Sequence, residues 1–160
     1  MSLLGADKRL MMTLSVKSDE HFMRQALKQA ALAYEKGEIP VGAVVVANHT
    51  IIAKAHNQTE QLNDVTAHAE MLALTAAFDQ IGGKYLQECS LYVTLEPCSM
   101  CAGAMFWAQL GKLYYAASDA KRGYTQYSKK LLHPRTEVAS GLFQEESKLL
   151  LQKFFAELRT

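Results

Sequence analysis

One histidine, one glutamate and two cysteines stand at spacings that suit a catalytic zinc site. His68 and Glu70 are separated by one residue, and the pair Cys98 and Cys101 follows Pro97 directly. Zinc that performs chemistry normally takes three protein ligands and keeps a fourth position for water, whereas four cysteines would close the site. One imidazole and two thiolates match that count. The pattern predicts an open zinc site with His68, Cys98 and Cys101 as ligands.

Glu70 is too close to His68 along the chain to be an obvious fourth ligand, but it is close enough to reach a metal-bound water. Zinc lowers the pKa of a bound water to roughly 7, so a proton acceptor beside the metal is useful at neutral pH. A carboxylate can take that proton and return it later in the reaction. We predict that Glu70 is the general acid/base of the site.

The spacing of the two cysteines predicts how the chain presents them. Two intervening residues let both sulfurs face one ion when a tight turn runs into the first turn of a helix, and Pro97 suits the extended approach to that turn. A helix N-terminus also directs amide donors and the positive end of the dipole toward the thiolates, which favours their ionised form. We therefore expect Cys98, and likewise His68, at the start of a helix.

Each half of this pattern also has a simpler interpretation. A lone Cys-x-x-Cys is typical of a redox motif or of half a structural zinc knuckle, and a lone His-x-Glu arises by chance. The chain has three cysteines in all, so it lacks a second pair for a four-cysteine site. The order, the spacing and the proline together favour the catalytic interpretation. Cys89 precedes a strand-like run and is expected to be an ordinary buried thiol.

Helix and strand signals alternate along the chain, which predicts a layered α/β domain. Ser18 is a good N-cap for a first helix that runs to Gly37, with acidic residues in its first turn. Apolar runs at 43–47 and 51–55, separated by the turn-forming stretch 48–50, predict a hairpin. Further elements are expected as a helix from 68 to 82, a strand at 91–95, a helix at 99–110, a strand at 113–117 and a helix at 144–158, the last with Leu151, Phe154, Phe155 and Leu158 on its apolar face.

The composition limits the class of protein. The chain has 160 residues, 49% of them hydrophobic and 21% charged, as expected for one globular domain at 18–160 after a flexible extension at 1–17. Its apolar runs are shorter than the roughly 20 residues of a membrane span, and its start lacks the apolar core of roughly 7 to 15 residues that a signal peptide needs. We expect a cytoplasmic protein without membrane contacts. Three cysteines, two of them assigned to metal, exclude a disulfide framework.

A basic segment follows between 119 and 135. It carries Lys121, Arg122, Lys129, Lys130 and Arg135 against the single acid Asp119, with Tyr124, Tyr127 and His133 interleaved. Cations for phosphates and aromatic faces for bases suit a single-stranded RNA loop. A solvated surface loop is an equally good interpretation, because charge runs are usually exposed. The net charge of +1 neither requires nor forbids nucleic acid.

The order His-x-Glu, then Pro-Cys-x-x-Cys, is the motif of zinc deaminases that act on nucleobases. The chain resembles the cytidine and deoxycytidylate deaminase superfamily, and within it the bacterial tRNA-specific adenosine deaminases, from about residue 22 to about residue 158. The stretches 37–44, 66–70, 91–98 and 100–105 carry this resemblance. It implies a three-layer αβα sandwich, in which a mixed sheet of about five strands has helices on both faces.

The resemblance also implies an activity, which is hydrolytic deamination of adenosine to inosine at the wobble position of tRNA with one Zn²⁺ per chain. It implies that His68, Cys98 and Cys101 hold the zinc and that Glu70 shuttles the proton. It further implies that Asn57 holds the target base and its ribose, while Pro40 and Leu95 line the pocket. Ala117, Asp119, Ala120 and Lys121 match a stretch used near the anticodon loop, and Asp119, Lys121 and Arg122 are the expected contacts with RNA. A homodimer whose subunits jointly shape the pocket is also expected.

Two other functions remain open from the sequence. A deaminase of a free nucleobase or nucleotide, of the guanine or cytosine type, is favoured by the segment 118–128, where Ser118 and 124–128 depart from the family pattern. The aromatic pair Phe106 and Trp107 resembles the sequence of bacterial guanine deaminases at this point. Core or dimer-interface positions also suit these two residues. A non-catalytic, zinc-stabilised RNA-binding module is disfavoured by Glu70, since a structural site has no use for a carboxylate beside the metal.

Overall fold

The fold is a single mixed sheet flanked by helices in a computed structural model, which describes residues 18–159. The extension expected at 1–17 lies outside the described residues. The strands are β1 (Gly42–Ala47), β2 (Thr50–His56), β3 (Cys89–Leu95), β4 (Lys112–Ala117) and β5 (Glu137–Ser140). The helices are α2 (Asp19–Glu35), α3 (Ala69–Ile81), α4 (Ser99–Ala108) and α5 (Gln144–Leu158), with short 3₁₀ turns η1 (Tyr124–Gln126) and η2 (Lys129–Leu131).

The five strands lie in the order β2-β1-β3-β4-β5. β1 is antiparallel to both β2 and β3, whereas β3, β4 and β5 are parallel. This confirms the expected mixed sheet of five strands. Of these, β5 had no separate signal in the sequence, because it is a four-residue edge strand whose residues are mostly exposed.

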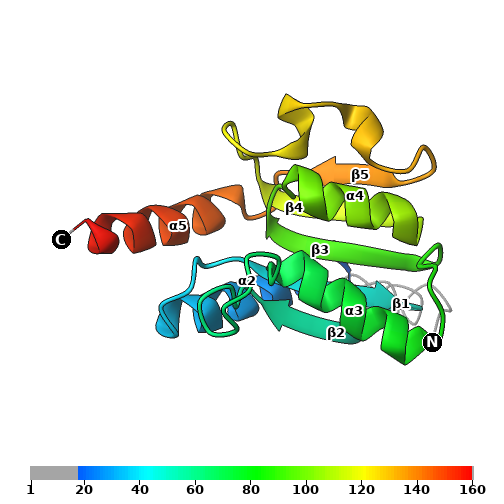
Figure 1. The fold of residues 1–160 in the computed structure, drawn as a ribbon, viewed down its shortest axis with the longest axis horizontal. Helices are drawn as coiled ribbons and strands as arrows, with labels where there is room; N and C mark the ends of the chain where they lie inside the picture. The colour runs from blue at the N-terminus through cyan, green and yellow to red at the C-terminus, as the bar shows by residue number, and fades with distance from the viewer. Residues whose placement is uncertain (1–17, 160) are drawn as a thin grey trace, which may run out of the picture.

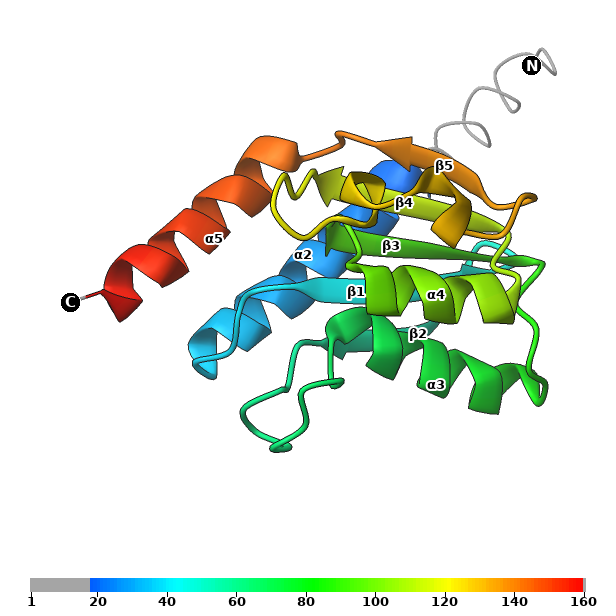
Figure 2. The same cartoon turned by 45° about the horizontal axis from the view of Figure 1, so that its top comes forward.

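Helices cover both faces of the sheet, as expected. In Figures 1 and 2, α3 and α4 lie side by side on one face and α2 lies across the other. The alternation of side chains along β1 divides the core accordingly. Ala43 and Val45 pack on the side of α3 and α4, while Val44 and Val46 pack with Phe22 of α2.

The hairpin forms as predicted but with a tighter turn. Asn48 and His49 both adopt positive φ angles of 49° and 59°, and Thr50 already pairs with Ala47 as the first residue of β2. Two central residues in the left-handed region match the twist of the flanking strands, so two residues suffice for the connection. Asn tolerates this conformation better than most residues do.

Two helix ends differ in how the chain terminates them. Gly82 ends α3 in the left-handed conformation, and its N–H donates to the carbonyl of Phe78, as the sequence predicts. α4 ends at Ala108, earlier than expected, because Gln109 takes the left-handed position at φ 53°. Gly111 is needed for space, since a Cβ there would lie 2.3 Å from the carbonyl oxygen of Gln87.

The C-terminal helix is only partly buried. Phe154 is buried and packs edge-on against Tyr34 of α2, but Phe155 and Leu158 are exposed. The expected apolar face is therefore covered by this chain only in part. Across the described residues, none of the helices has the length and apolar character needed to cross a membrane.

Candidate metal centre and active site

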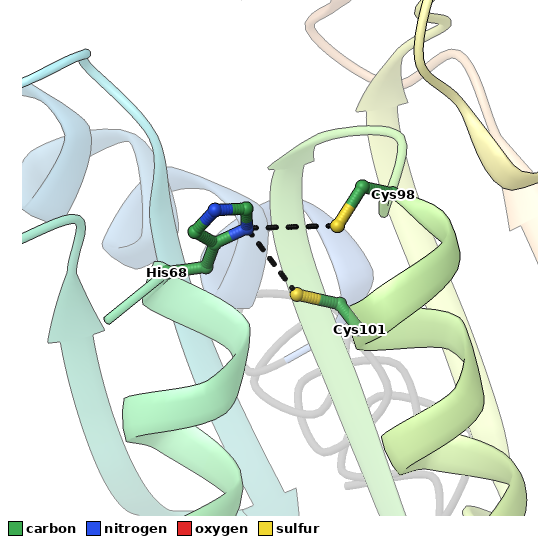
Figure 3. A group of neighbouring side chains, drawn as sticks. All are labelled: His68, Cys98 and Cys101. Carbon is green, nitrogen blue, oxygen red and sulfur yellow. Dashed lines mark hydrogen bonds between the residues drawn. The ribbon is translucent and has the colours of Figure 1, made fainter. Parts of the chain in front are cut away.

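The three expected ligands meet where two helices begin. His68 is the N-cap residue of α3 and Cys98 is the N-cap residue of α4, both with extended backbone, and Cys101 lies in the first turn of α4. β3 delivers the chain to this point, and α3 and α4 start at the same end of the sheet. Figure 3 shows the three side chains turned toward one another. The predicted placement at helix starts is confirmed.

The distances between these atoms fit a tetrahedral zinc ion. The His68 Nδ1 atom lies 3.6 Å from Cys98 Sγ and 3.5 Å from Cys101 Sγ. Zinc bonds of about 2.0–2.1 Å to nitrogen and about 2.3 Å to sulfur, at tetrahedral angles, place the two atoms about 3.5 Å apart. All three ligand atoms lie within 4.8 Å of one another. The donor set and its geometry therefore fit one zinc ion.

The electrostatics of the cluster also suit a cation. Hydrogen bonds from the Cys101 thiol and the His68 imidazole lower the pKa of Cys98 to about 4. The hydrogen bond that Cys101 donates to Cys98 raises the pKa of Cys101. At neutral pH the cluster thus carries a thiolate, which is the form of cysteine that binds metal.

Glu70 lies in the first turn of α3 and is 4% exposed. Its removal from water raises its pKa to about 7, because burial penalises the charged carboxylate. Its side chain contacts that of Cys101, so it stands beside the ligand cluster. A carboxyl group with this pKa can both accept and donate a proton near neutral pH, which fits the predicted general acid/base.

Asn57 directly follows β2 and is buried at the same end of the sheet. Its backbone N–H donates to the carbonyl of Val41, and its side-chain Nδ2 donates to the carbonyl of Ile39. Its Oδ1 atom is the one buried side-chain oxygen or nitrogen that has no hydrogen-bond partner among the described residues. Leaving such an acceptor unpaired costs about 1–3 kcal/mol, so Oδ1 is available to a ligand. This agrees with the role that the resemblance implies.

The two predicted pocket residues, Pro40 and Leu95, lie at the same end of the sheet as Asn57. Pro40 is buried between Ile39 and Val41, whose carbonyls hold Asn57. Leu95 ends β3 and is half-buried. Both residues are therefore placed near the ends of strands that lead into the site, and their contact with a substrate stays a prediction.

The basic segment is an ordered turn with exposed cations. The Asp119 Oδ1 atom accepts hydrogen bonds from the backbone N–H groups of Lys121 and Arg122, both at 3.0 Å. The side chains of Lys121 and Arg122 are exposed. One part of the interpretation is wrong, because Tyr124 is buried against Tyr115 and is not free to stack on a base. Tyr127 is exposed and keeps that option.

Glu38 has a role at the site that sequence reasoning missed. This carboxylate is 1% exposed and accepts hydrogen bonds from the backbone N–H groups of Glu60 and Gln61, at 2.9 and 2.8 Å. It thereby holds the loop that joins Asn57 to His68. The signal available in the sequence was an acidic residue directly before the stretch Ile39-Pro40-Val41. A carboxylate that is buried there needs hydrogen-bond donors from another segment.

The aromatic pair on α4 lies at the surface. Trp107 is 77% exposed, which excludes a core position in this chain, and its ring meets Phe106 edge-on. Together with Phe78 and Tyr85 these residues line a hollow of about 660 Å³ beside α3 and α4. Of the two positions expected for Trp107, the interface between subunits is the one that the burial leaves open.

Comparison with known proteins identifies the family. Residues 16–117 match the zinc-binding region of cytidine and deoxycytidylate deaminases. The chain belongs to this deaminase family. Because the matched region contains His68, Cys98 and Cys101, family membership and the geometry of the cluster agree on one zinc ion as the cofactor.

Within the deaminase family, the chain is similar to tRNA-specific adenosine deaminases. The protein of that name from Rickettsia felis is 43% identical over 144 residues, covering 86% of this chain and all of the relative. The one from Bacillus subtilis is 44% identical over 146 residues, covering 88% of this chain and 91% of the relative. Identity at this level over nearly whole chains places the protein in this group of deaminases.

Solved structures of deaminases have the same fold. A tRNA deaminase that edits adenosine to inosine at the wobble position is 42% identical, with a TM-score of 0.77 over 82% of this chain and 99% of that one. A guanine deaminase from Bacillus subtilis is 40% identical, with a TM-score of 0.61 over 63% of this chain and 65% of that one. The expected deaminase fold is confirmed.

Proposed function

We propose that the protein is a zinc-dependent hydrolase that converts adenosine to inosine at the wobble position of tRNA. The observation that carries the proposal is the cluster of half-buried His68 and Cys98 and buried Cys101, with the buried Glu70 beside it, in a chain that is over 40% identical to tRNA-specific adenosine deaminases along most of its length. The reaction consumes one water and releases one ammonia for each inosine formed.

In this proposal His68, Cys98 and Cys101 hold the zinc, which supplies an acidified water as a nucleophile at neutral pH. Asn57 orients the base, with its free Oδ1 accepting a hydrogen bond from the substrate. Glu70 accepts the proton of the attacking water and passes it to N1 of the purine as the bond to C6 forms. Glu70 then takes the remaining proton of the hydroxyl on C6 and delivers it to the amino group, which leaves as ammonia while C6 becomes a carbonyl.

The contacts with RNA are assigned to the turn that Asp119 organises. Lys121 and Arg122 are exposed on this turn, where their charges can meet phosphates of the anticodon loop. Tyr127 is 68% exposed and can stack on an unpaired base. Pro40 and Leu95 form walls for the base itself.

The proposal includes a homodimer. An exposed Trp107 beside a hollow lined by Phe78, Tyr85 and Phe106 is an apolar surface of the kind that proteins cover with a partner. A second copy of this chain is the partner expected from the sequence. A cytoplasmic location, in which all three cysteines stay reduced, is also part of the proposal.

The experiment offers the purified, zinc-loaded protein two tRNAs that differ only at the wobble position, one with adenosine and one with guanosine. Nucleoside mass spectrometry should find inosine in the first RNA alone, and the Cys98→Ala protein should form none. A free-base enzyme is the second candidate, favoured by similarity to the guanine deaminase structure. That candidate predicts no inosine and release of ammonia from guanine.

A further inference from the structure

Glu96 is a second buried carboxylate beside the metal cluster, and the proposed chemistry does not use it. It lies between Leu95 of β3 and Pro97, and it is 4% exposed. Burying a carboxylate is unfavourable unless donors surround it. The hydrogen bonds that it accepts come from a segment more than 20 residues further along the chain.

Both oxygens of Glu96 bind the segment 119–125. Oε1 accepts from the backbone N–H of Asp119 at 3.2 Å, and Oε2 accepts from the N–H and the hydroxyl of Thr125 at 3.1 and 2.8 Å. Hydrogen bonds to an ionised acceptor are stronger than neutral ones. One carboxylate therefore fixes this segment at both of its ends.

The same segment is tied to the chain that carries the Cys98 ligand. The N–H of Tyr124 donates to the carbonyl of Pro97 at 2.8 Å, and Gly123 forms an isolated β-bridge with Cys98. A Cβ on Gly123 would lie 1.9 Å from the Oε2 atom of Glu96, so only glycine fits here. The segment 119–125 and the ligand segment thus pack as one unit, with Glu96 between them.

Between its two fixed ends, the segment presents its cations. Asp119 caps the turn through Lys121 and Arg122, and its carbonyl accepts from the N–H of Gly123. Both basic side chains are exposed. The hydrogen bonds of Glu96, together with those of Tyr124 and Gly123, therefore hold the backbone of this turn against the segment that carries Cys98.

We propose that Glu96 is a positioning residue, which holds the segment 119–125 against the Cys98 ligand so that bound RNA meets Lys121 and Arg122 in register with the metal centre. This inference rests on the proposed function for its RNA part, while the ordering of the segment can be measured without any substrate. Thr125 belongs to the same device, because it supplies two of the three donors to Glu96.

Three variants test this device. Glu96→Gln places an amide NH₂ group against a backbone N–H or the hydroxyl of Thr125, so at least one of these hydrogen bonds is lost. Thr125→Val removes one donor and keeps the side-chain shape. Thr50→Val is the matched control, because its hydroxyl donates to the carbonyl of Asn48 in the hairpin turn, at the other end of β1 from the site.

Hydrogen exchange of the zinc-loaded proteins should be faster at Asp119 and Thr125 in Glu96→Gln, by about tenfold or more, with a smaller increase in Thr125→Val and none in Thr50→Val. Zinc content should stay at about one per chain. KM for an anticodon stem-loop should rise about tenfold while kcat changes less. Unchanged exchange at 119–125, or faster exchange throughout the core, would overturn the positioning role.

A double-mutant cycle separates the two levels of the inference. If Glu96 acts through the cations, Glu96→Gln should add little to the rise in KM already caused by Lys121→Ala with Arg122→Ala. Additive effects on KM would overturn the claim that Glu96 acts through these cations. If the parent protein leaves tRNA unmodified, the proposed function is refuted instead. The hydrogen-exchange data would still show whether Glu96 orders the segment 119–125.

Discussion

Two side chains of the site are held in states that cost free energy in the absence of a substrate. Burial keeps the pKa of Glu70 near 7, and the Oδ1 atom of Asn57 lacks a partner among the described residues. Surrounding structure has to offset such costs, and residues that serve only stability rarely carry them. Both features therefore support roles in binding and proton transfer.

Replacing Glu70 by Gln should abolish most turnover and leave the metal bound. The amide keeps the size of the side chain but cannot carry the proton, so kcat should fall by about 10² to 10⁴. Inosine formation measured together with zinc content tests this, with Glu88→Gln, an exposed glutamate before β3, as the matched control. Turnover near that of the parent would remove Glu70 from the mechanism.

Replacing Asn57 by Ala should lower kcat/KM for the RNA substrate more than it lowers the stability of the fold. The variant loses the acceptor that is free for the base, and a buried hydrogen bond of about 1–3 kcal/mol corresponds to a loss of roughly 5- to 150-fold in kcat/KM. Steady-state kinetics on an anticodon stem-loop measures this loss. An unaltered kcat/KM would show that the free Oδ1 atom does not meet the substrate.

The start of α4 and its two cysteine ligands were predictable from local spacing, and His68, 30 residues before Cys98, was predictable from the ligand types that zinc requires. The separation of Cys98 and Cys101 indicates a helix start, and the structure has α4 beginning at Ser99. The hydrogen bonds that Glu38 and Glu96 accept were not predictable, because their partners, 22 to 29 residues away, include backbone N–H groups, which any residue type carries. Tyr124 was misjudged for a related reason, because its partner Tyr115 lies on another element.

Neutralising Lys121 and Arg122 together should weaken binding of tRNA and reduce its salt dependence. Each phosphate contact that is lost lowers the slope of log affinity against log salt by roughly 0.7 to 1. Titrations at several salt concentrations measure the slope, with Lys28→Ala plus Lys148→Ala, two cations on α2 and α5, as a control of equal charge. An unchanged slope would show that Lys121 and Arg122 do not contact the RNA phosphates.

The whole molecule has an apolar surface that the described residues leave exposed. It lies along α3 and α4, away from the helix starts that carry the zinc ligands. Trp107 lies on α4, Tyr85 follows α3, and the hollow is lined by these two rings, by Phe78 and Phe106, and by polar residues that include Lys84 and Gln109. A single sequence predicts such a surface poorly, because the same residues suit a core. The exposure of Trp107 excludes a core position, and the interface stays a proposal.

Replacing Trp107 by Glu should convert the proposed dimer to a monomer. A charge at the centre of an apolar interface is left desolvated and unpaired, which costs several kcal/mol of association. Sedimentation velocity at micromolar concentration measures the change, with Leu149→Glu, an exposed apolar residue of α5, as the control. A parent protein that sediments as a monomer would contradict the proposed dimer.

The most direct test of the proposed activity compares two substrates in one preparation. Ammonia release by the zinc-loaded protein is measured with an anticodon stem-loop that carries adenosine at the wobble position and, in parallel, with free guanine. For a tRNA adenosine deaminase we expect one ammonia for each inosine formed in the RNA and no release from guanine. Release from guanine, with the RNA left unmodified, would contradict the proposed activity.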